Sequence, residues 1–353
     1  MSEVFTHEVV SHPAPSVRPE AREYTSEQQE LIAELREYAL SCLLPDDDPY
    51  QPNERRWIEE PECCARYMRA AKWKMVDAKK RIKGTIDWRR EYKPDLISAD
   101  EVEPENESGK IILNGFDNDG RPIITMRPGR QNTKPSERQI LHLIFCLERA
   151  IDYMPPNQDS MMILVDYRSA SLKTNPSIST AIKVLGILQN HYVERLGRAI
   201  VVRLPVLLNF FFKGIGPFMD PVTREKMKFN PSLPDLIPAE HLEAEFGGNF
   251  NYKFDHKSYW EQVCRHSGVR PDGSRYTPDW KKTISVETTP DSTSVPASLP
   301  DLVNDTDVDS SRAPSVHIAA AGLPPAQTLL DSAFKGLQLD PTPVNVVTPQ
   351  VSP

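Results

Sequence analysis

Apolar residues recur every three to four positions in three stretches near the start of the chain, as expected for helices that face a core. The first stretch, residues 25–44, opens with Thr-Ser, a typical helix start, and leads into a run of three aspartates and a proline. Residues 64–72 and 75–92 have the same periodicity. We therefore predict a helical N-terminal subdomain over residues 24–95.

A pair of short apolar runs follows, at residues 111–113 and 122–126. Between them lies Asp-Asn-Asp-Gly at 117–120, a sequence that favours a tight turn because its residues tolerate positive φ. The two runs are therefore predicted to pair as a β-hairpin.

The middle of the chain alternates between two patterns. Residues 161–166 and 199–204 are uninterrupted apolar runs, typical of strands buried on both faces, and residues 178–192 between them have helical periodicity. Strand, helix and strand in this order indicate a crossover unit and a parallel sheet. With an apolar helix at 137–154 and a short strand at 227–229, the expected fold class is α/β, with a largely parallel sheet.

Both ends of the chain lack such periodicity. Residues 1–23 contain three prolines and are predicted to be a flexible leader. Residues 283–353 are rich in Ser, Thr and Pro and hold ten of the 33 prolines, so we predict a disordered tail.

Charge and cysteine content narrow the class of protein. The net charge is −8, and residues 283–353, with eight acidic and two basic residues, account for −6 of it, so the remainder is nearly neutral and nucleic acid is not an expected partner. Five cysteines without CxxC spacing favour a reducing compartment. No window reaches the roughly 18 apolar residues of a membrane span. We expect a soluble, cytoplasmic protein that contacts membranes peripherally.

The sequence lacks the common motifs for catalysis and metal binding. The sequence contains no GxxxxGK[ST], HExxH or GxSxG motif, and none of the eight histidines pairs with another His or Cys at metal-ligand spacing. We therefore expect no enzyme activity, no metal and no cofactor other than a bound ligand.

Residues 207–219 form an apolar segment interrupted by Gly214 and Gly216. A helix that is apolar on nearly all sides is either fully buried, which is the simpler explanation, or shields something apolar and moves. The glycines favour a mobile gating helix. Its apolar residues are Leu207, Leu208, Phe210, Phe211, Phe212, Ile215 and Phe218.

Thr223 and Lys226 follow this segment, one helical turn apart. A hydroxyl and an ammonium on one helix face can together hold a phosphate. The pair is weak evidence alone, but its position beside an apolar lid points to a ligand that is part apolar and part charged, such as a phospholipid.

Residues 66–73 form a basic and aromatic strip between two of the predicted helices. Its basic side chains are Arg66, Arg69 and Lys72. A solvated face with packed aromatics is the simpler interpretation of this strip.

Five motifs in order over residues 64–252 resemble those of the CRAL-TRIO lipid-binding family. They are RYMRAAKW at 66–73, DGRP at 119–122, YVERLG at 192–197, PFMDP at 217–221 and FGG at 246–248. RPGRQNT at 127–133 and LERAID at 147–152 are similar to the fungal phosphatidylinositol transfer proteins of the pleiotropic-drug-resistance branch.

This resemblance implies a helical N-terminal subdomain and a lipid-binding domain over residues 96–262, in which a sheet floors an apolar pocket closed by the gating helix. Glu194, Thr223 and Lys226 match the inositol-phosphate positions of the family. It implies that Thr223 and Lys226 hold the phosphate and that Glu194 orients Lys226 or accepts hydrogen bonds from inositol hydroxyls.

The sequence departs from the family pattern at two places. Ala71 stands where the family prototype has an arginine, so that headgroup contact is missing or supplied by Lys72. Met161 and Ile163 replace hydroxyl residues of the pocket wall, and neither side chain can donate a strong hydrogen bond to a phosphate. Phosphatidylcholine is therefore not an expected ligand, and an apolar pocket of this kind leaves room for a sterol.

The expected function is non-enzymatic exchange of phosphatidylinositol between membranes, or its presentation to a phosphoinositide kinase. Membrane phospholipids are the expected partners, at the endoplasmic reticulum, lipid droplet or plasma membrane. Two alternatives remain open: a carrier or sensor for sterol or another apolar lipid, and a signalling scaffold that acts through residues 283–353.

Overall fold

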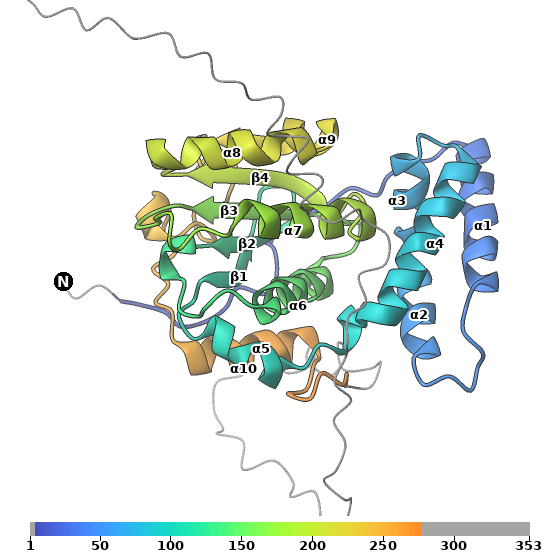
Figure 1. Ribbon diagram of the computed structural model, residues 1–353, viewed down its shortest axis with the longest axis horizontal. Helices are drawn as coiled ribbons and strands as arrows, with labels where there is room; N and C mark the ends of the chain where they lie inside the picture. The colour runs from blue at the N-terminus through green and yellow to red at the C-terminus, as the bar shows by residue number, and fades with distance from the viewer. Residues whose placement is uncertain (1–3, 277–353) are drawn as a thin grey trace, which may run out of the picture. The chain divides into compact units, whose positions relative to one another are not determined.

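The computed structural model describes residues 4–276, apart from the side chains of Leu207, Asn209 and Phe210. The disordered tail predicted for residues 283–353 lies outside the described residues. Within the described part, a mixed sheet has helices α6 (Glu137–Tyr153) and α7 (Ile178–His191) on one of its faces, and a group of helices precedes the sheet in the chain (Figure 1).

The N-terminal helices pack around their own apolar cluster. Thr25 caps the first of them through a reciprocal capping box with Gln28, which satisfies backbone N–H groups at the helix start. The helices are α1 (Ser26–Ser41), α2 (Gln51–Ile58), α3 (Cys63–Ala70) and α4 (Met75–Tyr92). Their cluster includes Leu35, Trp57, Tyr67, Met68, Ile82 and Ile86. The helices predicted near 25–44, 64–72 and 75–92 are confirmed.

The sheet has five strands in the order β1-β2-β3-β4-β5. β1 pairs with β2 as the predicted antiparallel hairpin, and the other neighbours run parallel. The strands are β1 (Ile111–Phe116), β2 (Pro122–Met126), β3 (Met161–Asp166), β4 (Leu196–Val202) and β5 (Met227–Phe229). The predicted α/β class and the crossover from β3 to β4 are confirmed.

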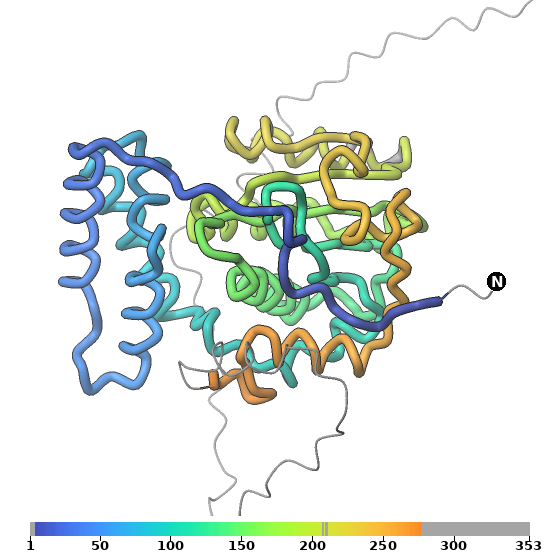
Figure 2. The backbone as a smooth tube through the Cα atoms, turned by 180° about the vertical axis from the view of Figure 1, so that it is seen from behind, coloured from blue at the N-terminus to red at the C-terminus, as the bar shows by residue number. Residues whose placement is uncertain are grey.

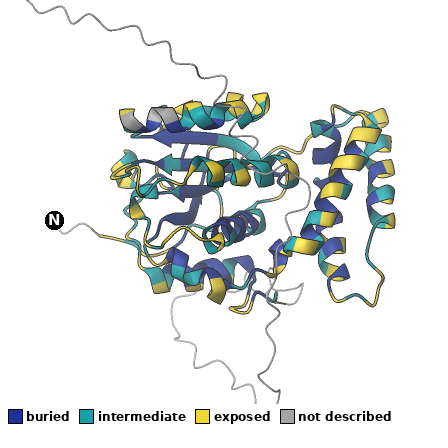
Figure 3. Cartoon of the chain, viewed as in Figure 1, coloured by how far each residue is buried: buried dark blue, intermediate teal, exposed yellow. Residues whose placement is uncertain are grey.

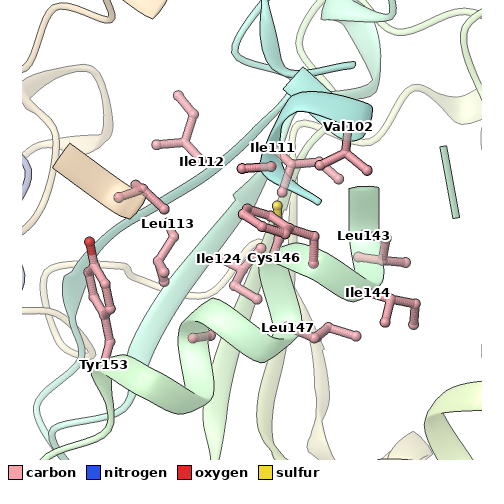
Figure 4. Close-up of a cluster of buried hydrophobic side chains, with 14 of the residues drawn as sticks. Val102, Ile111, Ile112, Leu113, Ile124, Leu143, Ile144, Cys146, Leu147 and Tyr153 are labelled. Carbon is pink, nitrogen blue, oxygen red and sulfur yellow. The ribbon is translucent and has the colours of Figure 1, made fainter. Parts of the chain in front are cut away.

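Helix α6 (Glu137–Tyr153) packs on β1 and β2, and α7 (Ile178–His191) connects β3 to β4. Helices α5 (Ala99–Asn106) and α10 (His256–Ser267) pack against α6. The main apolar core lies between these helices and the hairpin, where each fully buried Ile or Leu contributes about 1.5–3 kcal/mol (Figure 4). Its members include Val102, Ile111, Ile112, Leu113, Ile124, Ile144 and Leu147.

The second face of the sheet is covered by a long segment without regular structure. Met162, Leu164 and Ile200 point to this face, where they join a cluster with Leu233 and Ile237. The sheet is therefore sealed on one face by the chain that follows β5, and its other face is free to line a cavity.

The segment predicted as a flexible leader instead packs along the body of the protein, at least from residue 4 onward. The backbone N–H of Val10 donates to Asn114 on β1, at 2.8 Å, and the carbonyl of Val10 accepts from Gly115. Val9 and Ala14 are buried. Figure 2 shows this segment crossing the rear of the molecule before it reaches α1. Apolar contacts and hydrogen bonds with β1 give the segment a fixed path despite its lack of periodicity.

Candidate functional site

A cavity of about 880 Å³ lies between the free face of the sheet and helices α6 and α7. Its size is near the upper end for small-molecule pockets. Met161, Ile163 and Val165 line it, as the alternation of side chains along β3 requires. Met161 is buried, whereas Ile163 and Val165 are only partly so, because they face the cavity. The expectation that this strand is buried on both faces was wrong for that reason.

The predicted gating helix is divided into three short helices. They are a 3-10 helix at Val206–Leu208, α8 at Asn209–Ile215 and a second 3-10 helix at Gly216–Phe218. Phe211, Phe212 and Ile215 line the cavity. The side chains of Leu207 and Phe210 lie outside the described part of the chain.

Leu208 and Phe218, the other two described side chains of this set, do not line the cavity. Leu208 is buried in a cluster with Tyr167 and Val201. The carbonyl of Phe218 accepts a hydrogen bond of 3.2 Å from Gln189 on α7. The two glycines have different roles, because a Cβ at Gly214 would lie 3.1 Å from Ile178, whereas Gly216 is open. Gly214 thus permits close contact between α8 and α7, and only Gly216 is free of such a constraint.

Glu194, Thr223 and Lys226 all line this cavity, and the Glu194 carboxylate interacts electrostatically with Lys226. Glu194 precedes β4, and Thr223 and Lys226 lie on α9 (Pro221–Lys226), which leads directly into β5. All three therefore lie near the amino ends of the parallel strands. The Lys226 ammonium donates to the carbonyl of Leu196 at 2.6 Å, which places it against the start of β4.

The two α9 side chains are held in different ways. Asp220 caps α9, accepting from the backbone N–H of Thr223 at 2.9 Å and from its hydroxyl at 2.5 Å. Burial lowers the pKa of Lys226, while the carboxylates of Glu194 and Asp220 oppose that shift. Because this ammonium is partly desolvated, it interacts with an anion more strongly than an exposed ammonium does.

Arg69 was not predicted as a site residue, but it contacts Glu194 directly. Its Nε donates to Glu194 Oε2 at 2.6 Å, and its terminal nitrogens pair with Glu62 and Asp159. Glu194 has a left-handed backbone, with φ of 56°, a conformation that costs energy in residues other than glycine and collects at functional sites. The carboxylate is thus fixed in place by the N-terminal helices.

The basic and aromatic strip is therefore not a solvated face. Arg66 is only 2% exposed and pairs with Glu60, which also binds Arg195. Ala71 of the same strip is buried in the N-terminal helical cluster, whereas Lys72 is exposed and lines the cavity. Lys72 is the cation of this strip that is available to a ligand.

A second polar group lines the cavity at the opposite edge of the sheet. Lys110 pairs with Glu105, and the Thr133 hydroxyl donates to Glu105 at 2.5 Å. Burial lowers the pKa of Lys110, opposed by its bond to Glu105. No periodicity or motif singled out this group, because a Glu and a Lys five residues apart resemble any surface ion pair in sequence.

Within residues 4–276, no group of His, Cys, Asp and Glu side chains is arranged to hold a metal ion. In the same residues, no helix has both the length and the apolar character needed to cross a membrane.

Comparisons with known proteins agree with this arrangement. Residues 106–248 match the CRAL/TRIO domain, and residues 32–84 match the CRAL/TRIO N-terminal domain. A CRAL-TRIO domain-containing protein of Schizosaccharomyces pombe is 44% identical over 255 residues, which cover 69% of this chain and 25% of the relative. Phosphatidylinositol transfer protein PDR17 of Saccharomyces cerevisiae is 35% identical over 232 residues, which cover 62% of this chain and 66% of the relative.

Among solved structures, the crystal structure of Sfh5 is similar with a TM-score of 0.47 and 18% identity, over 59% of this chain and 81% of that one. The chain thus spans a quarter of the length of its fission yeast relative and just under two thirds of PDR17.

Proposed function

The chain belongs to the CRAL/TRIO family, and from this premise we propose that it is a phosphatidylinositol transfer protein. It takes phosphatidylinositol from one membrane, carries the acyl chains in the cavity, and delivers the lipid to another membrane or presents it to a phosphoinositide kinase. The cycle needs no covalent step. PDR17, which carries the name phosphatidylinositol transfer protein, supports this proposal.

One observation carries the proposal: a single cavity combines a long apolar wall with a cation, a hydroxyl and a carboxylate at one end. Each CH₂ moved from water into such a wall is stabilised by about 0.8 kcal/mol, which offsets the loss of the bilayer around the acyl chains. The polar end then selects the headgroup.

The three polar side chains have separate roles in this proposal. Lys226 supplies the positive charge for the phosphodiester, and Thr223 donates its hydroxyl to the same phosphate after releasing Asp220. Glu194 accepts hydrogen bonds from inositol hydroxyls through Oε1, since Oε2 is engaged by Arg69. Lys72 replaces the missing arginine at position 71 as a second cation near the headgroup.

Phosphatidylcholine is not a ligand in this proposal. Met161 and Ile163 occupy the wall of the cavity and offer no hydroxyl to a phosphate buried there. A buried phosphate without hydrogen-bond donors is strongly disfavoured.

The same apolar wall favours a second candidate function, transport or sensing of a sterol. A signalling scaffold that acts through residues 283–353 is a third candidate, and it concerns residues outside the described part. For any of these functions we propose peripheral contact with the endoplasmic reticulum, lipid droplets or plasma membrane from the cytoplasm.

Identification of the lipid that co-purifies with the protein separates these functions. We expect mass spectrometry of the purified full chain to find phosphatidylinositol at near one molecule per protein and no enrichment of phosphatidylcholine. A sterol in its place supports the second candidate. Deletion of residues 283–353 should leave the bound lipid unchanged. If the deletion abolishes a signalling activity while the lipid is retained, the scaffold function is supported.

A further inference from the structure

Three loops follow β2, β3 and β4 at the same edge of the sheet, the edge toward which the strand arrows point in Figure 1. They are in contact with one another. Ala170 and Leu204 pack on the same apolar cluster, and Gly129 lies so close to the carbonyl of Arg168 that a Cβ would clash. We call this group the carboxyl-edge surface, defined as residues 127–136, 167–177 and 203–213.

The charge of this surface is opposite to that of the chain. The whole protein has a net charge of −8, yet none of the three segments contains an Asp or a Glu. Together they contain seven basic residues, which are Arg127, Arg130, Lys134, Arg168, Lys173, Arg203 and Lys213. Such segregation of charge favours an anionic partner.

Three of these cations are neutralised by neighbours. Arg127 and Arg168 pair with Glu245, and Arg203 pairs with Asp166. The other four are exposed and form no ion pair with any described residue: Arg130, Lys134, Lys173 and Lys213. Four free cations therefore remain on one surface.

Exposed apolar side chains lie among these cations. Leu172 is 60% exposed and Val206 is 83% exposed, each in one of the adjacent loops, and Figure 3 shows exposed residues along this edge. A single exposed apolar side chain is ordinary. Two of them in neighbouring loops, surrounded by basic residues, match the composition of surfaces that lie in the headgroup layer of an anionic membrane.

This surface also borders one opening of the cavity. Lys173 and Ser177 of the second loop line the cavity, as does Phe212 of α8. Glu194 and Lys226 lie at the opposite, amino edge of the sheet. The carboxyl-edge surface is thus separate from the headgroup end.

We propose that the carboxyl-edge surface docks the protein on an anionic phospholipid bilayer. Its free cations contact the lipid headgroups, and Leu172 and Val206 insert between them. Docking in this orientation brings the cavity opening against the bilayer, so that acyl chains pass into it without crossing water. The role of the opening rests on the proposed lipid transfer, whereas docking itself does not.

Binding to vesicles tests this directly. We use the full chain with vesicles of phosphatidylcholine alone or with added phosphatidylserine, both without phosphatidylinositol, and measure co-sedimentation. Lys134→Gln combined with Lys213→Gln removes two free cations that do not line the cavity. We expect affinity for phosphatidylserine vesicles to fall about 25-fold, or about fivefold for each cation. Lys80→Gln combined with Lys257→Gln removes the same charge from exposed positions outside the surface and should leave it unchanged.

Insertion is tested with Leu172→Trp, whose fluorescence should shift to the blue with phosphatidylserine vesicles and not with phosphatidylcholine alone. Equal binding of the wild type to both vesicle types, or an equal loss in the control variant, overturns the proposal. So does failure to bind phosphatidylserine vesicles, even if the surface captures an acidic protein. These vesicles lack phosphatidylinositol, so the experiment measures docking alone. Failure of docking can therefore be distinguished from failure of phosphatidylinositol transfer.

Discussion

Arg69 on α3 holds the carboxylate of Glu194 through a 2.6 Å hydrogen bond, although 125 residues separate them in sequence. The same guanidinium pairs with Glu62 and with the buried Asp159. The polar end of the cavity is therefore built jointly by the N-terminal helices and the sheet. The orientation of Glu194, and with it the proposed recognition of inositol hydroxyls, depends on a residue outside the 106–248 range that matches the CRAL/TRIO domain.

Arg69→Lys should weaken phosphatidylinositol binding more than it weakens the fold. Lysine keeps the charge near Asp159 but cannot bond three carboxylates in the planar geometry of a guanidinium. Loss of one charge-assisted bond to Glu194, worth about 1.5–3 kcal/mol, predicts an affinity lower by at most roughly 10- to 100-fold. Lipid binding and urea unfolding measure the two effects. A folded Arg69→Lys protein with unchanged affinity would show that Arg69 has only a structural role.

Lys226→Ala should reduce phosphatidylinositol transfer by roughly 10- to 100-fold, because about 1.5–3 kcal/mol of charge-assisted bonding to the phosphate is lost. The free energy of unfolding should fall by about 1 kcal/mol or less, since the protein loses only the hydrogen bond from Lys226 to the carbonyl of Leu196. Lys228→Ala removes an equal charge two residues away, from an exposed position on β5. Equal transfer by the two variants would refute the assignment of Lys226.

Local pattern was sufficient to predict most of the fold. The strands were found as short apolar runs, and the longer helices were found because their apolar residues recur every three to four positions. Helices α2, α5 and α10 were not predicted. Helix α5 contains Pro104 and one large apolar residue, Val102, so its conformation depends on packing against α6 rather than on its own sequence.

The residues of the candidate site could likewise be predicted only in part. Thr223 and Lys226 were found from their spacing next to an apolar segment and Glu194 through a family resemblance, and all three line the cavity. Arg69 could not be assigned, because a pairing across 125 residues leaves no local signal. The packing of Val9 and Ala14 was missed for the same reason, since their partners are distant in sequence.

Ile163→Thr should admit phosphatidylcholine, because it restores a hydroxyl donor to the cavity wall. The stability cost should be about 1–3 kcal/mol, that of placing a hydroxyl on an apolar surface. Ile163→Val is the control, since it shortens the side chain without adding a donor. Mass spectrometry of bound lipid reports the outcome. Phosphatidylcholine in the wild-type protein, or none in a folded Ile163→Thr protein, would contradict the explanation based on hydroxyl donors.

Phosphatidylinositol binding should weaken as the pH rises. It should do so at a lower pH than the one at which an ordinary lysine loses its proton. Burial lowers the pKa of Lys226 from 10.5, so the free protein gives up this ammonium at a lower pH than an exposed lysine does. The bound phosphate favours the charged form, and affinity therefore falls as the pH rises through the pKa of the free protein.

The effect of Lys226 on stability has the opposite sign. Between the lowered pKa and 10.5, the unfolded chain binds more protons at this lysine than the folded protein does, so the contribution of Lys226 to stability rises with pH. Lys226→Arg keeps its charge throughout this range and should remove both dependences. We would measure lipid affinity and urea unfolding from pH 7 to 10 and compare the wild type with Lys226→Arg. Parallel affinity profiles for the two proteins would show that Lys226 does not titrate at the headgroup site, because only the wild type carries a group there whose charge changes with pH.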